Sequence, residues 1–154
     1  MNALWIALRF LTRLPAPEPH YNEASMAHSI QFYGWIGVLI GALVCLPQIA
    51  LSPPPLLSAA ILVALMQWLT GGLHADGLTD CADAWVGGRD KDHTLRIMKD
   101  PHIGAMGVNA LVCVLLIQFS AVTTLAHTSQ LILCLCVTCA CSRSAAAWLL
   151  LLTP

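Results

Sequence analysis

Two long stretches of the chain carry no charged residue, and this pattern predicts membrane-spanning helices. Residues 24–75 contain no Lys, Arg, Asp or Glu, and residues 101–142 repeat the pattern. A helix needs about 20 apolar residues to cross the hydrocarbon core of a bilayer. The two stretches, together with the apolar end of the chain, therefore predict four spans, at residues 30–50, 56–73, 106–126 and 131–152.

Short turn-forming segments separate the predicted spans. Three prolines at residues 53–55 follow the first span, so we expect the first two spans to form a helical hairpin, and residues 127–129 separate the last two. In the first span, Gly37 and Gly41 have the four-residue spacing that lets two helix backbones approach closely. The alternative is that membrane helices simply tolerate glycine.

The N-terminal segment, residues 1–19, combines apolar residues with Arg9 and Arg13 and ends in a run of spaced prolines. It is too short to cross a bilayer. It also lacks the basic leading region and the small-residue cleavage site of a signal peptide. We therefore expect an amphipathic helix that lies at the membrane interface.

Composition supports an integral membrane protein. Hydrophobic residues make up 58% of the chain and charged residues only 10%, against about 25% charged residues in typical soluble domains. The net charge of −1 and the lack of a basic stripe argue against nucleic-acid binding. We predict an all-α, polytopic helical bundle that forms a single membrane domain over residues 1–154, with membrane lipid around it and reduced cysteines in its apolar runs.

The distribution of positive charge predicts the orientation of the bundle. Arg9, Arg13 and the charged segment at residues 89–99 fall on one side of the membrane if every predicted span crosses it. The turns at residues 53–55 and 127–129 carry no Lys or Arg and fall on the other side. Because short cytoplasmic loops are rich in Lys and Arg, we expect the charged segment to face the cytoplasm from the inner membrane.

Arg143 departs from this distribution, since it lies near the middle of the last apolar run. A cation at that depth is costly and usually faces the bundle interior or a polar cavity, where it could contact a substrate phosphate. The alternative is that the last span consists of two shorter pieces, broken near Ser142, with Arg143 at a membrane interface.

All six aspartates lie in one segment, residues 70–107. If residues 76–83 form a helix, which advances about 100° per residue, Asp80 and Asp83 lie about 40° and 20° to either side of Asp76. Like charges held so close favour a bound cation, and Mg²⁺ commonly bridges carboxylates to substrate phosphates. The pattern predicts a phosphoryl-transfer site, with a solvated acidic helix end as the alternative.

Other polar residues of this segment are weaker candidates. His74 lies about 160° from Asp76 on an ideal helix, so it would reach the same ion only if Gly77 broke the helix. Hydrogen-bonding, structural and catalytic roles for His74 stay open. Residues 90–99 predict a short charged amphipathic helix that is stopped by Asp100 and Pro101.

The motif GGLHADGLTDCAD at residues 71–83, followed by IMKD at residues 97–100 and by Ile103-Gly104-x2-Gly107, resembles the cobalamin synthase family, adenosylcobinamide-GDP ribazoletransferase. The opening at residues 10–17, the glycines of the first span and Ser142-Arg143 are also similar to that family, so the resemblance covers essentially the whole chain. One departure is Ala84, where the family often has glycine. Family members are longer, and we therefore expect an N-terminal portion that lacks their C-terminal helices.

The resemblance implies a membrane transferase that uses Mg²⁺. It would join adenosylcobinamide-GDP to α-ribazole or its 5′-phosphate, releasing GMP in the last steps of cobalamin biosynthesis, and a homo-oligomer stays open. The resemblance and the spacing together make Asp76, Asp80 and Asp83 candidate metal ligands. Asp100 would be a further ligand or the base, His74 a catalytic candidate, and the substrate-binding candidates are Lys99, Arg96 and Arg143. Solvation of a cytoplasmic loop is the simpler explanation for Lys99 and Arg96.

Two other classes remain as alternatives. The first is another Mg²⁺-dependent intramembrane transferase, but the Ala-Arg pair of CDP-alcohol phosphotransferases and the second aspartate motif of UbiA-like prenyltransferases are missing here. The second is a non-enzymatic cation carrier. A carrier should place carboxylates within its spans, whereas all six aspartates lie between the predicted spans.

Overall fold

The computed structural model describes residues 2–152, and every regular element in that range is a helix. In chain order the elements are α1 (Asn2–Leu11), α2 (Glu23–Ser29), the 3₁₀ turn η1 (Ile30–Phe32), α3 (Tyr33–Val44), α4 (Leu46–Leu51), α5 (Pro55–Thr70), α6 (Leu73–Gly87), α7 (Lys91–Ile97), α8 (Ala105–Leu125) and α9 (Leu131–Leu152). The predicted all-α class is confirmed.

Three helical stretches in residues 2–152 are long and apolar enough to cross a membrane by themselves. They are the run from α2 through α4 (Glu23–Leu51), α8 and α9. A fourth is counted if α5 and α6, which are bent by 88° to one another, form one broken span. The predicted polytopic membrane bundle is thus confirmed, with its second span altered.

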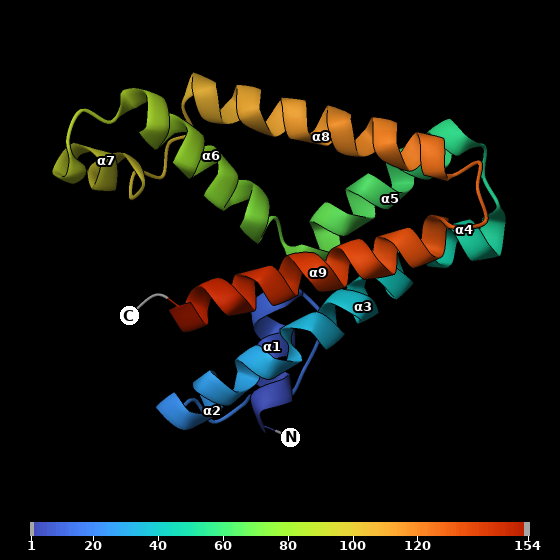
Figure 1. Ribbon diagram of the computed structural model, residues 1–154, viewed down its shortest axis with the longest axis horizontal. Coiled ribbons are helices and arrows are strands. Elements are labelled where there is room, and N and C mark those ends of the chain that lie inside the picture. Colours follow the sequence, from blue (N-terminus) through green and yellow to red (C-terminus); the bar gives the residue numbers. More distant parts are fainter. Residues whose placement is uncertain (1, 153–154) are drawn as a thin grey trace.

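Two glycines explain that alteration. The predicted second span, residues 56–73, ends in the structure at Thr70, because Gly71 and Gly72 have φ angles of 69° and 74°. This left-handed conformation ends a helix and suits glycine, which has no Cβ. The bend turns the aspartate-bearing helix α6 away from the axis of α5 (Figure 1).

Helix α3 lies along α9, whereas α5 crosses α8 obliquely and α6 packs against α8 as well (Figure 1). A Cβ on Gly41 would lie 2.6 Å from the Cα of Cys136, and one on Gly37 would lie 2.7 Å from the Cα of Ala140. The predicted close approach at these glycines is confirmed, and α9 is the partner. The first two spans also contact each other through α3, α4 and α5, as a hairpin requires, but α3 contacts α9 more extensively than α5.

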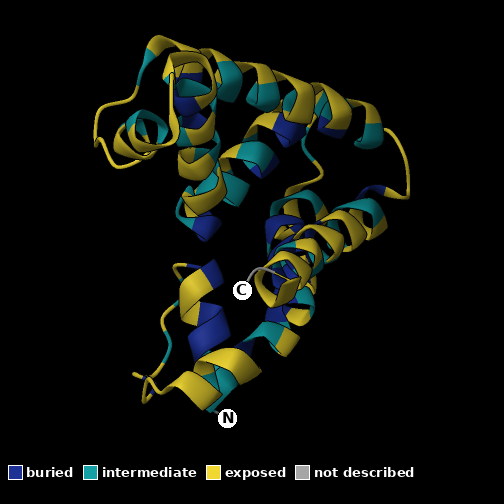
Figure 2. Ribbon diagram, turned by 60° about the vertical axis from the view of Figure 1, so that its left-hand side comes forward, coloured by how far each residue is buried: buried dark blue, intermediate teal, exposed yellow. Residues whose placement is uncertain are grey.

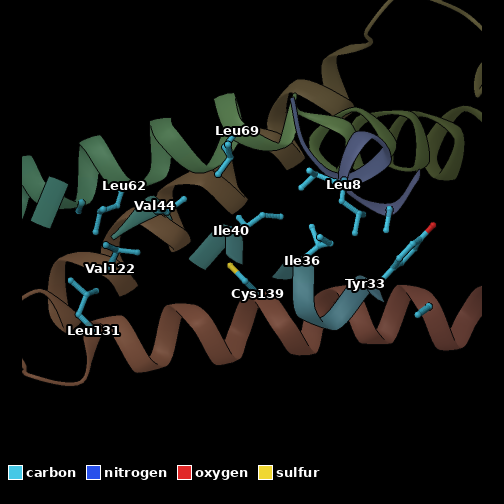
Figure 3. Close-up of a cluster of buried hydrophobic side chains, with 14 residues drawn as sticks. Leu8, Tyr33, Ile36, Ile40, Val44, Leu62, Leu69, Val122, Leu131 and Cys139 are labelled. Atoms are coloured by element: carbon cyan, nitrogen blue, oxygen red, sulfur yellow. The ribbon is translucent and has the colours of Figure 1, made fainter. Parts of the chain in front are cut away.

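A buried apolar cluster joins α1 to the spans (Figure 3). Leu8 of α1 lies in this cluster with Tyr33 and Ile36 of α3, and Ile40 and Cys139 bring α3 and α9 together. The predicted N-terminal helix is confirmed as α1, and its buried side packs against α2 and α3. Its place at the membrane interface stays a prediction.

The outer faces of the long helices are apolar and uncovered. Leu116 and Ile117 on α8 are 62% and 68% exposed, and Trp148 on α9 is 66% exposed. Exposed residues line the outer sides of both helices (Figure 2). Surfaces of this kind suit contact with lipid rather than water. Helices α2 and α7 lie toward one end of the molecule, and α4 and the α8–α9 turn toward the other, which agrees with the predicted arrangement of charged and uncharged loops (Figure 1).

Candidate active site

Helix α6 positions the three clustered aspartates. It runs without a break from Leu73 to Gly87, so Asp76, Asp80 and Asp83 share one face, as the spacing predicts. Gly77 lies inside the helix and does not interrupt it. The break that would bring His74 to the same ion as Asp76 is therefore not present.

Asp83 joins α6 to the start of α8. Its two carboxylate oxygens accept hydrogen bonds from the backbone N–H groups of Gly104, at 2.7 Å, and Gly107, at 2.8 Å. The first N–H groups of a helix have no partner within the helix, and the helix dipole favours an anion at this end. Gly104 is the N-cap residue of α8 and has no side chain to fill this role, so Asp83 serves as the cap from another helix.

The same contact requires glycine at two positions. A Cβ on Gly104 or Gly107 would overlap the carboxylate of Asp83, and one on Gly107 would also lie 2.9 Å from the carbonyl oxygen of Thr79. The Ile103-Gly104-x2-Gly107 motif therefore has a structural reason. Sequence reasoning missed the pairing because it joins residues 21 and 24 positions apart.

Asp76 and Asp80 are differently placed from Asp83. Asp76 is exposed, Asp80 is half-buried, and the side chain of neither forms a hydrogen bond or ion pair within residues 2–152. Asp76 lines a hollow of about 440 Å³, together with Gly71, Gly72, Leu73, Ala75, Thr79, Ile103 and Leu111. The two carboxylates are thus free to bind a ligand.

The donor chemistry of this face fits Mg²⁺. Mg²⁺ is usually held by one or two carboxylates, with water and substrate phosphates as its other ligands, and Asp76 and Asp80 provide such a pair. No group of three His, Cys, Asp or Glu residues in the described part of the chain forms a metal cage. The assignment of Asp83 as a third ligand stays a prediction, and its oxygens already accept two amide hydrogen bonds.

Asp100 lies in the exposed loop between α7 and α8. Its carboxylate accepts a hydrogen bond from the backbone N–H of His102 at 3.0 Å and contacts the His102 Nδ1 at 2.7 Å. These hydrogen bonds, that of the backbone N–H first, lower the pKa of Asp100. A carboxylate with a lowered pKa is a weaker base, which favours its predicted ligand role over its predicted role as base.

Helix α7 confirms the predicted short charged helix, with a shorter extent. It covers Lys91–Ile97, and the side chain of Asp90 caps it by accepting from the His93 N–H. Arg96 and Lys99 are exposed, and neither forms an ion pair within the described residues. Their roles in substrate binding stay predictions.

Arg143 and His74 line a different space from Asp76. Both line a cavity of about 330 Å³ between α5, α6, α8 and α9. Helix α9 is continuous through Arg143, which is only 7% exposed, so the alternative of a last span broken near Ser142 is wrong. The expectation that this cation faces the bundle interior is confirmed.

Comparison with known proteins agrees with the motifs. A curated relative from Acinetobacter baumannii, named adenosylcobinamide-GDP ribazoletransferase, is 46% identical over 140 residues, which are 89% of this chain and 57% of the relative. Relatives of the same name from Pseudomonas fluorescens and Desulfitobacterium hafniense are 45% and 41% identical over 133 residues, which are 84% of this chain and 55% and 52% of those relatives.

The chain spans about half the length of the curated relatives it matches. No solved structure matches it. The family model described as cobalamin-5-phosphate synthase matches residues 3–154. The chain therefore belongs to the cobalamin-5-phosphate synthase family.

Proposed function

We propose that this chain carries the metal-binding segment of an adenosylcobinamide-GDP ribazoletransferase. The enzyme would join adenosylcobinamide-GDP to α-ribazole or its 5′-phosphate and release GMP. Family membership and the names of the relatives support the reaction. The observation that carries the proposal is that Asp76 and Asp80 share one face of α6 with neither carboxylate paired among the described residues, and that Asp76 lines a hollow.

The residues of this face have separate roles in the proposed transfer. Asp76 and Asp80 would hold Mg²⁺, with Asp83 as the predicted third ligand. Bound Mg²⁺ would neutralise charge on the transferring and leaving phosphate oxygens. Asp83 would also fix the position of this face relative to α8, through its bonds to Gly104 and Gly107.

The reaction also requires a base for the hydroxyl proton and groups that bind the guanosine diphosphate. A ribose hydroxyl oxygen of α-ribazole bonds to the phosphorus that bears the cobinamide, the bond from that phosphorus to GMP breaks, and GMP leaves with the electron pair. The hydroxyl proton must pass to a base. Asp100 is the predicted candidate in this segment, but its lowered pKa makes it a weak base and favours a role as a further metal ligand. Lys99 and Arg96 would bind the guanosine diphosphate as exposed cations beside the loop of Asp100.

We also propose that the protein lies in the inner membrane with α6 and α7 at the cytoplasmic face. The cations of the 89–99 segment support this orientation, since the turns at residues 53–55 and 127–129 have no Lys or Arg. Adenosylcobinamide-GDP and α-ribazole 5′-phosphate both carry charged phosphates, so a cytoplasmic site would give them direct access.

The alternatives have less support. The family match over residues 3–154 favours this reaction over a CDP-alcohol phosphotransferase or a UbiA-like prenyltransferase. Because α6, which carries three of the six aspartates, belongs to the bent fourth span, the position of the aspartates does not argue against a cation carrier, and the family match does.

The proposal is tested by GMP release. Membranes that contain the chain are incubated with Mg²⁺, adenosylcobinamide-GDP and α-ribazole 5′-phosphate, and the A. baumannii relative is assayed in parallel. We expect GMP that depends on both substrates, and loss of that GMP in Asp76→Asn. Asp92→Asn, which removes an exposed charge from α7, is the matched control and should retain the activity. Substrate-dependent GMP that is equal in Asp76→Asn and the parent chain would contradict the proposed site.

A further inference from the structure

The cavity between α5, α6, α8 and α9 is mostly apolar. Its walls are formed by aliphatic side chains of all four helices, including Val63, Leu78, Leu115 and Leu135. A few polar groups interrupt these walls, among them Gln67, His74, Gln118 and Arg143. An apolar pocket with a few convergent polar groups is the usual form of a small-molecule site.

Arg143 is the exceptional group in this cavity. It is 7% exposed, its Nε is buried without a hydrogen-bond partner, and its guanidinium takes part in no hydrogen bond or ion pair within residues 2–152. No Asp or Glu lines the cavity. Because an uncompensated buried cation is costly, an anionic ligand would remove much of this cost.

The cavity adjoins the hollow beside Asp76. Ala75 of α6 and Leu111 of α8 line both spaces, so the two are separated by one wall. His74 and Asp76 lie on opposite faces of α6 and open onto the two different spaces. A molecule in the cavity would therefore lie beside the Asp76 hollow, across the wall that the two spaces share.

From these observations we infer that the cavity binds the acceptor substrate, an aryl riboside phosphate, with its phosphate on Arg143 and its aromatic base against the aliphatic walls. This inference rests on the proposed function and adds the location of one of its two substrates. The ribose would lie between phosphate and base, and its hydroxyl would face the wall shared with the Asp76 hollow.

Size selects the acceptor over the other substrate. The cavity volume, about 330 Å³, is at the low end of the range for small-molecule pockets, roughly 300–1,000 Å³. α-Ribazole 5′-phosphate consists of one dimethylbenzimidazole ring system, one ribose and one phosphate. Adenosylcobinamide-GDP carries a corrin macrocycle and two nucleosides and is several times larger. The smaller substrate also matches the cavity chemically, since its aromatic ring system suits the aliphatic walls and its single phosphate suits the single buried arginine.

Direct binding tests the inference without requiring turnover. The purified chain, in phosphatidylcholine nanodiscs, is titrated with radiolabelled α-ribazole 5′-phosphate in the absence of adenosylcobinamide-GDP. We expect saturable binding that Arg143→Gln weakens by about tenfold to a hundredfold, the range expected for hydrogen bonds to a charged group. Arg143→Lys should recover part of the affinity, and Arg9→Gln, on the exposed face of α1, should leave it unchanged.

A second ligand and a second variant separate the two halves of the pocket. α-Ribazole without its phosphate should bind more weakly, and Arg143→Gln should not weaken it further. Leu115 lines the aliphatic wall, so Leu115→Trp should fill part of the cavity and weaken the binding of both ligands. Circular dichroism and size-exclusion chromatography check that each variant is folded.

The possible results decide between the nucleotide and a lipid phosphate. If phosphatidylglycerol binds in an Arg143-dependent way and α-ribazole 5′-phosphate does not, the cavity is a lipid site and the inference is wrong. The inference is also wrong if folded Arg143→Gln binds the nucleotide as well as the parent chain, even if GMP release supports the proposed function. Arg143-dependent binding without GMP release would contradict only the proposed function.

Discussion

The backbone N–H of Gly107 donates a 2.8 Å hydrogen bond to the carboxylate of Asp83, which joins the aspartate-bearing helix to the first turn of a membrane span. One of the three aspartates on this face thus has a structural partner, whereas Asp76 and Asp80 have none among residues 2–152. The contacts of the side chains therefore distinguish a structural role for Asp83 from the ligand role proposed for Asp76 and Asp80.

Asp83→Ala should destabilise the protein. It leaves the N–H groups of Gly104 and Gly107 without their acceptor, and hydrogen bonds to charged groups are worth about 1.5–3 kcal/mol each. We expect a lower midpoint of thermal unfolding in detergent and faster hydrogen exchange at the start of α8. Asp76→Ala removes an exposed aspartate from the same helix face and should leave both measurements unchanged. Equal stability of the two variants would contradict the capping role.

Because α3 and α9 are in close contact at Gly41, adding a side chain at that position should lower the stability of the protein. Gly41→Ala should destabilise the bundle by about 1–3 kcal/mol, because the new Cβ would lie 2.6 Å from the Cα of Cys136 and the backbones must separate. Gly77→Ala is the matched control. No atom lies within 4 Å of a Cβ at that position, and alanine favours a helix over glycine by about 0.5–1 kcal/mol, so this change should stabilise α6. Thermal unfolding of both variants in detergent measures the difference.

The sequence predicts local features well because they depend on neighbouring residues. Four-residue spacing places Asp76 and Asp80 on one face, and uncharged runs predict the long helices α8 and α9. Contacts between segments that are distant in the chain are harder to predict from the sequence. Gly37 and Gly41 indicate a close approach but not its partner, and nothing near Asp83 shows that its carboxylate meets α8. The bend at Gly71 and Gly72 falls inside the predicted second span, because an uncharged run does not show where the backbone turns left-handed.

The predicted orientation is testable by labelling a single cysteine. Gly88 is unsuitable for it, since a Cβ there would overlap Thr94, so we choose the exposed Asp92 on α7. In a background without native cysteine, Asp92→Cys should react with a membrane-impermeant maleimide only after the cytoplasmic face is opened. A cysteine at Thr128, in the α8–α9 turn, should react from outside. The opposite pattern would reverse the orientation.

Asp100 should keep its charge at lower pH than an ordinary aspartate. The backbone N–H and the imidazole of His102 contact the Asp100 carboxylate and lower its pKa, so the stability that these contacts give to the loop is present above the ordinary pKa of Asp. That stability is lost as the pH falls through the lowered pKa. The carboxyl carbon shift of labelled Asp100, followed by NMR during acid titration, measures this pKa. His102→Ala should raise the measured pKa, and an unchanged value would show that the imidazole contributes nothing.

Asp76 and Asp80 should act as one metal-binding unit. Asp→Asn keeps the side-chain volume but removes a charged oxygen ligand, so each single change should sharply reduce GMP release and raise the Mg²⁺ concentration it requires. A double change should cost little more than either single change, because residues that act as a unit are not additive. The predicted third ligand, Asp83, provides the contrast: Asp83→Asn should reduce both activity and thermal stability, since it also weakens the cap on α8.

Mg²⁺ titrations of GMP release, together with thermal unfolding of the same variants, test this assignment. Asp90→Asn and Asp92→Asn are the controls. Asparagine caps a helix as well as aspartate, so the N-cap of α7 at residue 90 should be kept, and Asp92 is exposed. If Asp76→Asn and Asp80→Asn respond to Mg²⁺ like these controls, the acidic face of α6 only solvates the helix. If their losses are instead additive, each carboxylate acts independently and the two do not share an ion.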